Sequence, residues 1–209
     1  MRIGIFGGTF DPIHQGHLVV AEQAREQANL DEVWFVLAAR PPHKSGQQPT
    51  PFDKRADMVE LAIAGNPAFR LEKMEAERTG PSYTVDTLTA IRTRDPQTDL
   101  YLMLGADCLP DLPNWHQPQK IVSMSRLLVA ARPGWSIWPE DRIRTALNLP
   151  KEAPLSMQII IVPQIDIASR DLRRRIAAGL STRYMIPNAV LAYIRDKNLY
   201  RDPAASKEE

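Results

Sequence analysis

The sequence predicts an α/β fold built on a doubly wound parallel sheet. Two observations support this prediction. Short apolar runs alternate along the chain with longer segments of helical periodicity. The apolar runs are continuous rather than alternating, which is typical of a parallel sheet that helices cover on both faces. In such a sheet, ligands bind beyond the carboxyl ends of the strands.

The order of the elements follows from these patterns. Strands are expected at residues 2–6, 33–37, 100–104, 127–131 and 158–162. Helices are expected at residues 18–28, 54–64, 85–93, 118–123, 139–147, 171–179 and 187–196. Right-handed crossovers between these strands predict a Rossmann-like sheet of about five or more strands with helices on both faces. We expect residues 1–201 to form one domain and the small, charged tail at 202–209 to be disordered.

Composition narrows the class of protein. The 26 basic and 25 acidic residues nearly cancel, so no global field favours nucleic acid or an anionic membrane as a partner. The single cysteine, Cys108, excludes an internal disulfide and fits a reducing compartment. The amino-terminal segment is typical of a strand rather than a signal peptide, and no apolar run approaches the roughly 18 residues of a membrane span. We therefore expect a cytoplasmic protein, and a homo-oligomer is compatible with the sequence.

The turn after the first strand is the most informative segment. The strand ends on Gly7 and Gly8, where the backbone can approach a ligand closely. His14 and His17 follow at the start of a helical segment, where backbone N–H groups and the helix dipole favour an anion. Neither the lysine-centred phosphate loop nor the G-x-G-x-x-G fingerprint occurs in the chain. The pattern indicates phosphate chemistry built on His14-Gln15-Gly16-His17.

Polar and charged side chains also follow the other predicted strands. These segments are residues 40–44, residues 105–115, Arg132 and residues 169–173. Because the carboxyl ends of parallel strands meet at one edge of a sheet, we expect these segments to converge there. Residues 40–53 are rich in proline and long for a connection, which predicts a functional or mobile loop.

The stretch Gly-Gly-Thr-Phe-Asp-Pro-Ile-His-Gln-Gly-His at 7–17 resembles the signature of nucleotidyltransferases. More narrowly, the chain resembles the bacterial nicotinate-nucleotide adenylyltransferases. Further matching segments are Pro-Pro-His-Lys at 41–44, Pro-Ser-Tyr-Thr-Val-Asp-Thr-Leu at 81–88, Leu-Gly-Ala-Asp at 104–107, Leu-Pro-Asn-Trp at 112–115, Arg-Pro-Gly at 132–134, Ile-Ala-Ser-Arg-Asp-Leu-Arg at 167–173, Val-Leu-Ala-Tyr-Ile at 190–194 and Leu-Tyr at 199–200. They occur in order and span nearly the whole chain.

This resemblance implies the reaction. AMP would pass from ATP to the 5′-phosphate of nicotinate mononucleotide, giving nicotinate adenine dinucleotide and pyrophosphate in NAD biosynthesis. Transfer would be direct and in line, since such a reaction requires positioning and charge neutralisation more than covalent help from the protein. Mg²⁺ is the expected cofactor, held mainly by phosphate oxygens rather than by protein ligands.

The resemblance also implies roles for individual residues. His17 would contact the α-phosphate region, His14 the more distal phosphates, and Lys44 would complete the catalytic set. The residues implied in ATP binding are Gly7, Gly8, Thr9, Phe10, Gly105, Ser169 and Arg173. The residues implied in mononucleotide binding are Asp11, Thr84, Asp107, Trp115, His116 and Arg132. Within this last set, the Trp115 indole would stack on the pyridine ring, and backbone N–H groups of Thr84 and His116 would hold the nicotinate carboxylate.

One segment departs from the family pattern. The family reads Ile-Ser-Ser-Thr-x-Ile-Arg where this chain has Ala168 in place of the first serine and Arg170 in place of the threonine. One or two hydroxyl contacts to the triphosphate are therefore expected to be missing. Arg170 either replaces them or belongs to the solvated face of its helix.

Other functions remain open at this stage. The nearest is the same reaction with nicotinamide mononucleotide, the amide in place of the acid. A second is a non-catalytic nucleotide-sensing protein on the same fold, although intact His14, His17 and Lys44 argue against lost catalysis. The tRNA-charging enzymes also carry an H-x-G-H element, but they need much more chain for the acceptor stem, and the charge here is balanced.

Overall fold

A computed structural model describes residues 1–41, 48–131 and 134–201. At its centre is a six-stranded sheet with the order β3-β2-β1-β4-β5-β6, and every neighbouring pair is parallel. The strands are β1 (Arg2–Gly8), β2 (Glu32–Leu37), β3 (Phe69–Glu72), β4 (Asp99–Gly105), β5 (Arg126–Ala130) and β6 (Met157–Ile160). The predicted doubly wound parallel sheet is confirmed.

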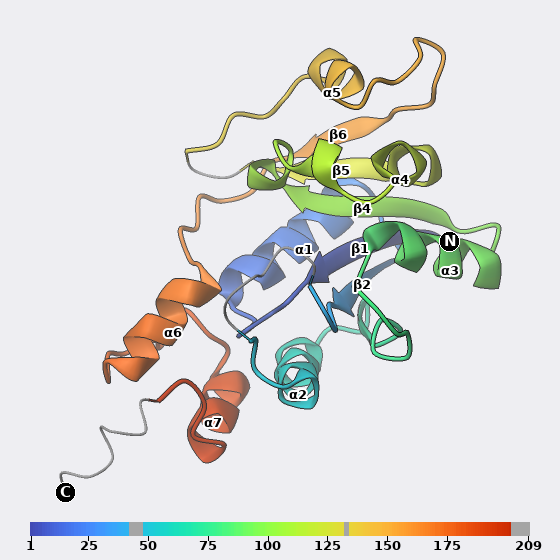
Figure 1. Cartoon of the computed structure of the whole chain (residues 1–209). Coiled ribbons are helices and arrows are strands. Elements are labelled where there is room, and N and C mark those ends of the chain that lie inside the picture. The colour runs from blue at the N-terminus through green and yellow to red at the C-terminus, as the bar shows by residue number, and fades with distance from the viewer. Residues whose placement is uncertain (42–47, 132–133, 202–209) are drawn as a thin grey trace, which may run out of the picture.

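Helices cover both faces of this sheet. They are α1 (Gln15–Gln27), α2 (Phe52–Ile63), α3 (Thr84–Arg94), α4 (Pro118–Met124), α5 (Glu140–Ala146), α6 (Ser169–Ala177) and α7 (Asn188–Asp196), with short 3₁₀ turns η1 (Ala106–Cys108) and η2 (Leu112–Asn114). Buried residues of α1, α2, α6 and α7 join one core cluster, and those of α3, α4 and α5 join the other. Figure 1 shows α6 and α7, in orange and red, gathered at the lower left near α2.

The central strands are apolar throughout because both of their faces are buried. In β2, Phe35 and Leu37 point into the cluster with α1 and α2, while Trp34 and Val36 point into the cluster with α3 and α4. Phe35 and Leu37 are each 0 % exposed. A strand with two buried faces has no polar alternation, which is the pattern that the sequence shows.

Strand β3 was absent from the sequence-based expectation. It spans only four residues, Phe69–Glu72, and is mostly exposed or half-buried at the edge of the sheet. Arg70 and Glu72 interrupt its apolar character. Its strand conformation comes from pairing with β2, where Phe69 lies opposite Val33, rather than from a local pattern.

The chain reverses its direction of travel across the sheet between β1 and β4. From β1 it proceeds to β2 and β3 on one side, and β4, β5 and β6 follow on the other side of β1. Connections that leave the ends of β1 and β4 therefore diverge, and a crevice forms outside the carboxyl ends of these two strands. Figure 1 shows β1 and β4 side by side in the middle of the molecule.

A buried arginine fixes the turn after β1. Arg55 of α2 is 1 % exposed. Its Nε donates to the carbonyl of Thr50 at 2.7 Å, and its Nη1 donates to the carbonyls of Thr9 and Ala38 at 2.9 Å each. Burial lowers the pKa of Arg55, and the nearby charge of Asp11 opposes that shift. One guanidinium thus joins the turn after β1, at Thr9, to the chain just after β2, at Ala38, and to the segment before α2, at Thr50.

The end of the chain supports the same turn. The Tyr200 hydroxyl donates to Asp11 Oδ1 at 2.6 Å, and the Thr50 N–H donates to Asp11 Oδ2 at 3.2 Å. Arg173 of α6 donates from Nη1 to the Asp11 carbonyl at 2.6 Å. The Ser169 hydroxyl donates to the Pro12 carbonyl at 3.0 Å. Segments far apart in the sequence therefore converge on residues 9–12.

No helix in the described part of the chain combines the length and apolar character of a membrane span.

Arg55→Met should lower the free energy of unfolding by about 3 kcal/mol. Each buried carbonyl left without a donor costs about 1–3 kcal/mol, and removal of the buried charge offsets part of that cost. Urea unfolding would measure the change, with Arg195→Met as the control because Arg195 is exposed near the end of α7. A loss below about 1 kcal/mol would mean that the guanidinium does not hold the three segments together.

Tyr200→Phe should flatten the loss of stability at alkaline pH. Burial, and then the Asp11 charge, raise the pKa of Tyr200 above its ordinary value of 10.0. Stability that depends on the neutral phenol is fully present below about pH 10, the unfolded value, and is lost as pH rises above it. The wild-type slope should exceed that of the variant by up to about 1.4 kcal/mol per pH unit.

Unfolding by urea at several pH values above 10 would give both slopes. Tyr193 contributes to both proteins, since burial and Asp57 raise its pKa to about 12. Tyr184→Phe is the matched control because Tyr184 is 83 % exposed. Equal slopes for wild type and Tyr200→Phe would contradict the predicted coupling.

Candidate active site at the ends of β1 and β4

A cavity of about 430 Å³ lies at the reversal point of the sheet. Seven of the site residues expected from the sequence line it: Gly7, His14, His17, Gly105, Asp107, Trp115 and Ser169. A smaller cavity of about 110 Å³ adjoins it, and Gly8 and Thr84 are among its lining residues. Gly7, Met103, Leu104 and Trp115 line both cavities. Residues expected to bind ATP and residues expected to bind the mononucleotide therefore line two adjoining cavities.

The two histidines open helix α1. His14 is its N-cap residue, with extended backbone angles, and His17 occupies the third helical position. The His14 N–H donates to His17 Nδ1 at 3.2 Å, and the two rings stack with their centroids 3.6 Å apart. Because His17 Nδ1 accepts this bond, the neutral His17 ring carries its proton on Nε2. The helix start thus orients His17 as a donor through Nε2.

The turn after β1 owes its shape to close packing. A Cβ atom at position 8 would lie 2.8 Å from the Phe10 ring, so only glycine fits at Gly8. Phe10 itself has a φ of 46° and is 3 % exposed. Its ring meets His17 edge-on at 5.1 Å between centroids. Phe10, expected as an ATP ligand, therefore supports His17 from the core through its side chain.

A second glycine shapes the end of β4. A Cβ atom at Gly105 would overlap the Asp107 carboxylate, which folds back over the strand end. Asp107 lies in η1, and both residues line the larger cavity. The end of β4 therefore presents a carboxylate to the same cavity that the two histidines line.

Trp115 and Thr84 both line the smaller cavity, and Trp115 lines the larger one as well. Trp115 follows η2 and is half-buried, and Thr84 is the first residue of α3. The Tyr83 ring lies 4.4 Å from the His116 ring between centroids, at 30° between planes. This contact holds the chain at His116 against the start of α3. The backbone positions that the resemblance assigns to the nicotinate carboxylate are thereby brought close together.

Five other expected residues are not among those that line these two cavities. Among the described residues, those expected in the site but absent from the lining of both cavities are Thr9, Phe10, Asp11, His116 and Arg173. Asp11 is 5 % exposed and bonds to Tyr200 and Thr50 as described above. Asp11 and Arg173 were expected to bind different substrates, yet Arg173 donates to the Asp11 carbonyl. The geometry gives both a supporting part in the turn.

Arg170 lies on the solvated side of α6. Its side chain is 79 % exposed, and its Nε lies 3.7 Å from Asp171 Oδ1. Ala168 is the N-cap residue of α6, and Ser169 begins the helix. Lys44 and Arg132 fall outside the described residues.

Sequence reasoning missed two groups of supporting residues. Arg55 is one. The sequence indicated its burial only through its spacing, since Arg55 lies three and four residues before Met58 and Val59 and so shares their buried face of α2. The second group is Glu75, Arg78 and Thr87, beside the smaller cavity. Thr87 lies in the matching segment at 81–88 but was assigned no role, and Glu75 and Arg78 belong to no motif in the sequence.

Comparison with known proteins identifies relatives over nearly the whole chain. Residues 5–175 match the family model described as cytidylyltransferase-like. A protein of Thermomicrobium roseum named "Probable nicotinate-nucleotide adenylyltransferase" is 44% identical over 200 residues, covering 96% of this chain and 92% of that protein. A protein with the same name from Thermus thermophilus is 43% identical over 201 residues, covering 96% of this chain and 100% of that protein.

Solved structures share the fold. The Plasmodium falciparum nicotinic acid mononucleotide adenylyltransferase complexed with NaAD aligns with a TM-score of 0.78 and 22% identity, covering 95% of this chain and 97% of that chain. The same enzyme complexed with APC aligns with a TM-score of 0.77, covering 95% of this chain and 96% of that chain. On the extent and identity of the sequence matches, this chain belongs to the nicotinate-nucleotide adenylyltransferases of the cytidylyltransferase-like family.

Proposed function

We propose that this chain transfers AMP from ATP to the 5′-phosphate of nicotinate mononucleotide, with release of pyrophosphate, in the synthesis of NAD. The observation that carries the proposal is the pair of adjoining cavities at the ends of β1 and β4. A helix start with two histidines lines the larger cavity, and Trp115 and the start of α3 line the smaller one. The names of the relatives supply the substrates.

At the phosphate end, the turn after β1 and the start of α1 provide donors for ATP. An oxygen of the mononucleotide phosphate attacks the α-phosphorus, and the bond from that phosphorus to the pyrophosphate oxygen breaks. Negative charge spreads over the phosphoryl oxygens as this happens. A fixed Nε2–H of His17 and the positive end of the α1 dipole stabilise that charge without reorganising. The histidines act as donors and form no covalent bond.

At the mononucleotide end, Trp115 offers an apolar face for the pyridine ring. Stacking of a base on an aromatic side chain is worth about 1–3 kcal/mol. Backbone N–H groups at Thr84 and His116 lie near that ring in the proposed complex and can donate only to a partner with free lone pairs. A carboxylate satisfies two such donors, whereas an amide brings its own NH₂ group against one of them.

The donor set around the space bears on the metal. Among residues 1–41, 48–131 and 134–201, no group of three or more His, Cys, Asp or Glu side chains is arranged to hold a metal ion. We propose that Mg²⁺ is held mainly by the phosphates of ATP, with the Asp107 carboxylate in the same cavity. When bound there, Mg²⁺ would neutralise charge on the phosphate oxygens.

Three further assignments belong to the proposal. Lys44 is proposed as a phosphate-binding cation and Arg132 as a mononucleotide-binding one, both on the family resemblance alone. The activity is proposed to be cytoplasmic, which the single cysteine and the small soluble substrates favour.

His17→Ala should lower turnover by two or more orders of magnitude, because loss of one preorganised donor costs about 10²–10³ in rate. His17→Asn is the sharper variant, since its carbonyl can still accept the His14 N–H while it offers no donor at the position of Nε2. Steady-state pyrophosphate release measures both. If His17→Asn kept more than about a tenth of wild-type turnover, the assigned donor role would be wrong.

Pyrophosphate release from ATP with the acid and amide mononucleotides, side by side, tests the proposed reaction. The acid should be favoured in kcat/KM by about 10²-fold or more, because a mispaired buried donor costs about 1–3 kcal/mol and the acid gains two such contacts. Comparable efficiencies would support the amide reaction instead. No release with either mononucleotide would support a nucleotide sensor.

A further inference from the structure

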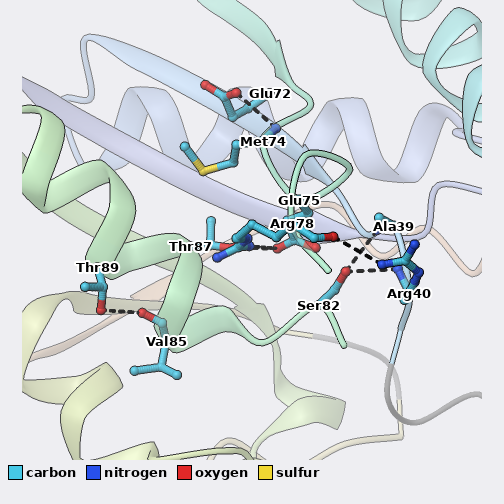
Figure 2. Close-up of polar contacts among 10 residues, drawn as sticks. All are labelled: Ala39, Arg40, Glu72, Met74, Glu75, Arg78, Ser82, Val85, Thr87 and Thr89. Atoms are coloured by element: carbon cyan, nitrogen blue, oxygen red, sulfur yellow. Dashed lines mark hydrogen bonds and ion pairs between the residues drawn. The ribbon is translucent and has the colours of Figure 1, made fainter. Parts of the chain in front are cut away.

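A partly buried polar network borders the smaller cavity, which Glu75 and Thr87 help to line. The Thr87 hydroxyl donates to Glu75 Oε1 at 2.6 Å and accepts from Arg78 Nη2 at 2.7 Å. Arg78 Nη2 also lies 3.7 Å from Glu75 Oε1. Thr87 is 1 % exposed and the Glu75 side chain 7 % exposed. Figure 2 shows the three side chains meeting at the Thr87 hydroxyl.

The network is continuous with the proposed mononucleotide pocket. Glu75, Thr84, Thr87 and Trp115 all line the cavity of about 110 Å³. Thr84 and Thr87 are three residues apart in α3, so their side chains share one face of the helix. The Thr87 N–H also bonds to the Tyr83 carbonyl at 3.3 Å, within the first turn. A change at Thr87 is therefore transmitted to Thr84 through a single helical turn.

Stability alone does not account for this arrangement. A buried carboxylate is costly unless its oxygens are fully bonded, and apolar residues of similar size often replace buried ion pairs at no loss. Within the described part of the chain, Glu75 Oε2 and Arg78 Nη1 are buried and have no hydrogen-bond partner. The pair is therefore only partly satisfied, which favours a role in fixing geometry over one in stabilising the core.

The same segment is fastened to the chain that follows β2. The Ser82 hydroxyl accepts the N–H groups of Ala39 and Arg40 at 3.0 Å each. Arg40 Nη1 donates to the Arg78 carbonyl at 3.1 Å. Figure 2 shows these bonds beside the network. Residues 75–83 are thus held on one side by α3 and on the other by residues 39–40.

We propose that Glu75, Arg78 and Thr87 are positioning residues that set the affinity for the mononucleotide and its selectivity for the acid. They fix the first turn of α3, so that the Thr84 N–H meets the substituent of the pyridine ring. This inference rests on the proposed function. Within the described lining, none of the three belongs to the larger cavity that holds the histidines. Binding of ATP alone is therefore independent of them.

Thr87→Val tests the proposal, because it keeps the shape of the side chain and removes both bonds of the hydroxyl. The KM for nicotinate mononucleotide should rise about tenfold or more, as a buried partner is left unpaired. The KM for ATP should change less than about twofold, since the larger cavity is untouched. The acid-to-amide ratio of kcat/KM should fall by a similar factor of about ten, and Thr87→Ser should restore both quantities.

Thr89→Val is the matched control. Thr89 lies two residues further along α3, and its hydroxyl donates to the Val85 carbonyl at 2.7 Å (Figure 2). Among the described residues that line the two cavities, Thr89 is not included. Thr89→Val should leave both KM values and the acid-to-amide ratio at their wild-type levels.

Equal rises in the two KM values, or equal effects of Thr87→Val and Thr89→Val, would overturn the inference and make the network structural. If Thr87→Val fails to fold, Glu75→Gln answers the same question. Glutamine keeps an acceptor for Thr87 but loses the charge that faces Arg78, so the acid-to-amide ratio should fall by about threefold or more. An unchanged ratio in a folded Glu75→Gln would overturn the inference.

The wild-type enzyme separates this failure from that of the proposed function. If wild type releases pyrophosphate with neither mononucleotide, the proposed function fails and the inference falls with it. If wild type prefers the acid and the Thr87 and Glu75 variants behave as wild type, only the inference fails.

Discussion

The site depends on a single buried guanidinium. Loops at the carboxyl edge of a parallel sheet expose carbonyls that no strand can pair, and burial of such groups is costly. Arg55 supplies donors to three of them, from Thr9, Ala38 and Thr50. Because these carbonyls belong to the turns after β1 and β2 and to the start of α2, one side chain sets the relative position of three walls. We therefore expect the positions of these three segments to depend on the hydrogen bonds of Arg55.

The reversal of strand order divides the work between two helices. Helix α1 leaves β1 on one face of the sheet and brings His14 and His17, while α3 precedes β4 on the opposite face and brings Thr84. Each helix presents its amino-terminal end, where donors and the dipole favour an anion. A reaction between two anionic substrates needs such a pair of helix starts on either side of one crevice.

The carboxyl-terminal helices pack into the core cluster of α1 and α2, and the carboxyl-terminal segment also supports the turn after β1. Ser169 and Arg173 of α6 bond to the carbonyls of Pro12 and Asp11, and Tyr200 bonds to the Asp11 carboxylate. The segment that departs from the family pattern lies here. Because Arg170 is exposed while Ser169 and Arg173 hold the turn, the departure spares the contacts that shape the site.

Sequence was most informative where structure is local. Continuous apolar runs predicted the parallel strands, and the motif from Gly7 to His17 predicted a site where Gly7, His14 and His17 do line the larger cavity. Contacts between residues far apart in the chain, which form only on folding, could not be predicted from the sequence. Strand β3 is too short and polar to show a pattern and depends on pairing with β2. The bond between Arg173 and Asp11, 162 residues apart, and the meeting of Glu75 with Thr87 have no signature in the chain.

A crystal structure with nicotinate mononucleotide and a non-transferable ATP analogue bound together tests the central claim most directly. In that complex the α-phosphate should lie within hydrogen-bond distance of His17 Nε2, and the pyridine ring should lie on Trp115 with its carboxylate at the Thr84 N–H. The two phosphates should face each other in line across Gly7. A mononucleotide bound outside the space between Trp115 and the start of α3, or a triphosphate away from the start of α1, would contradict the account.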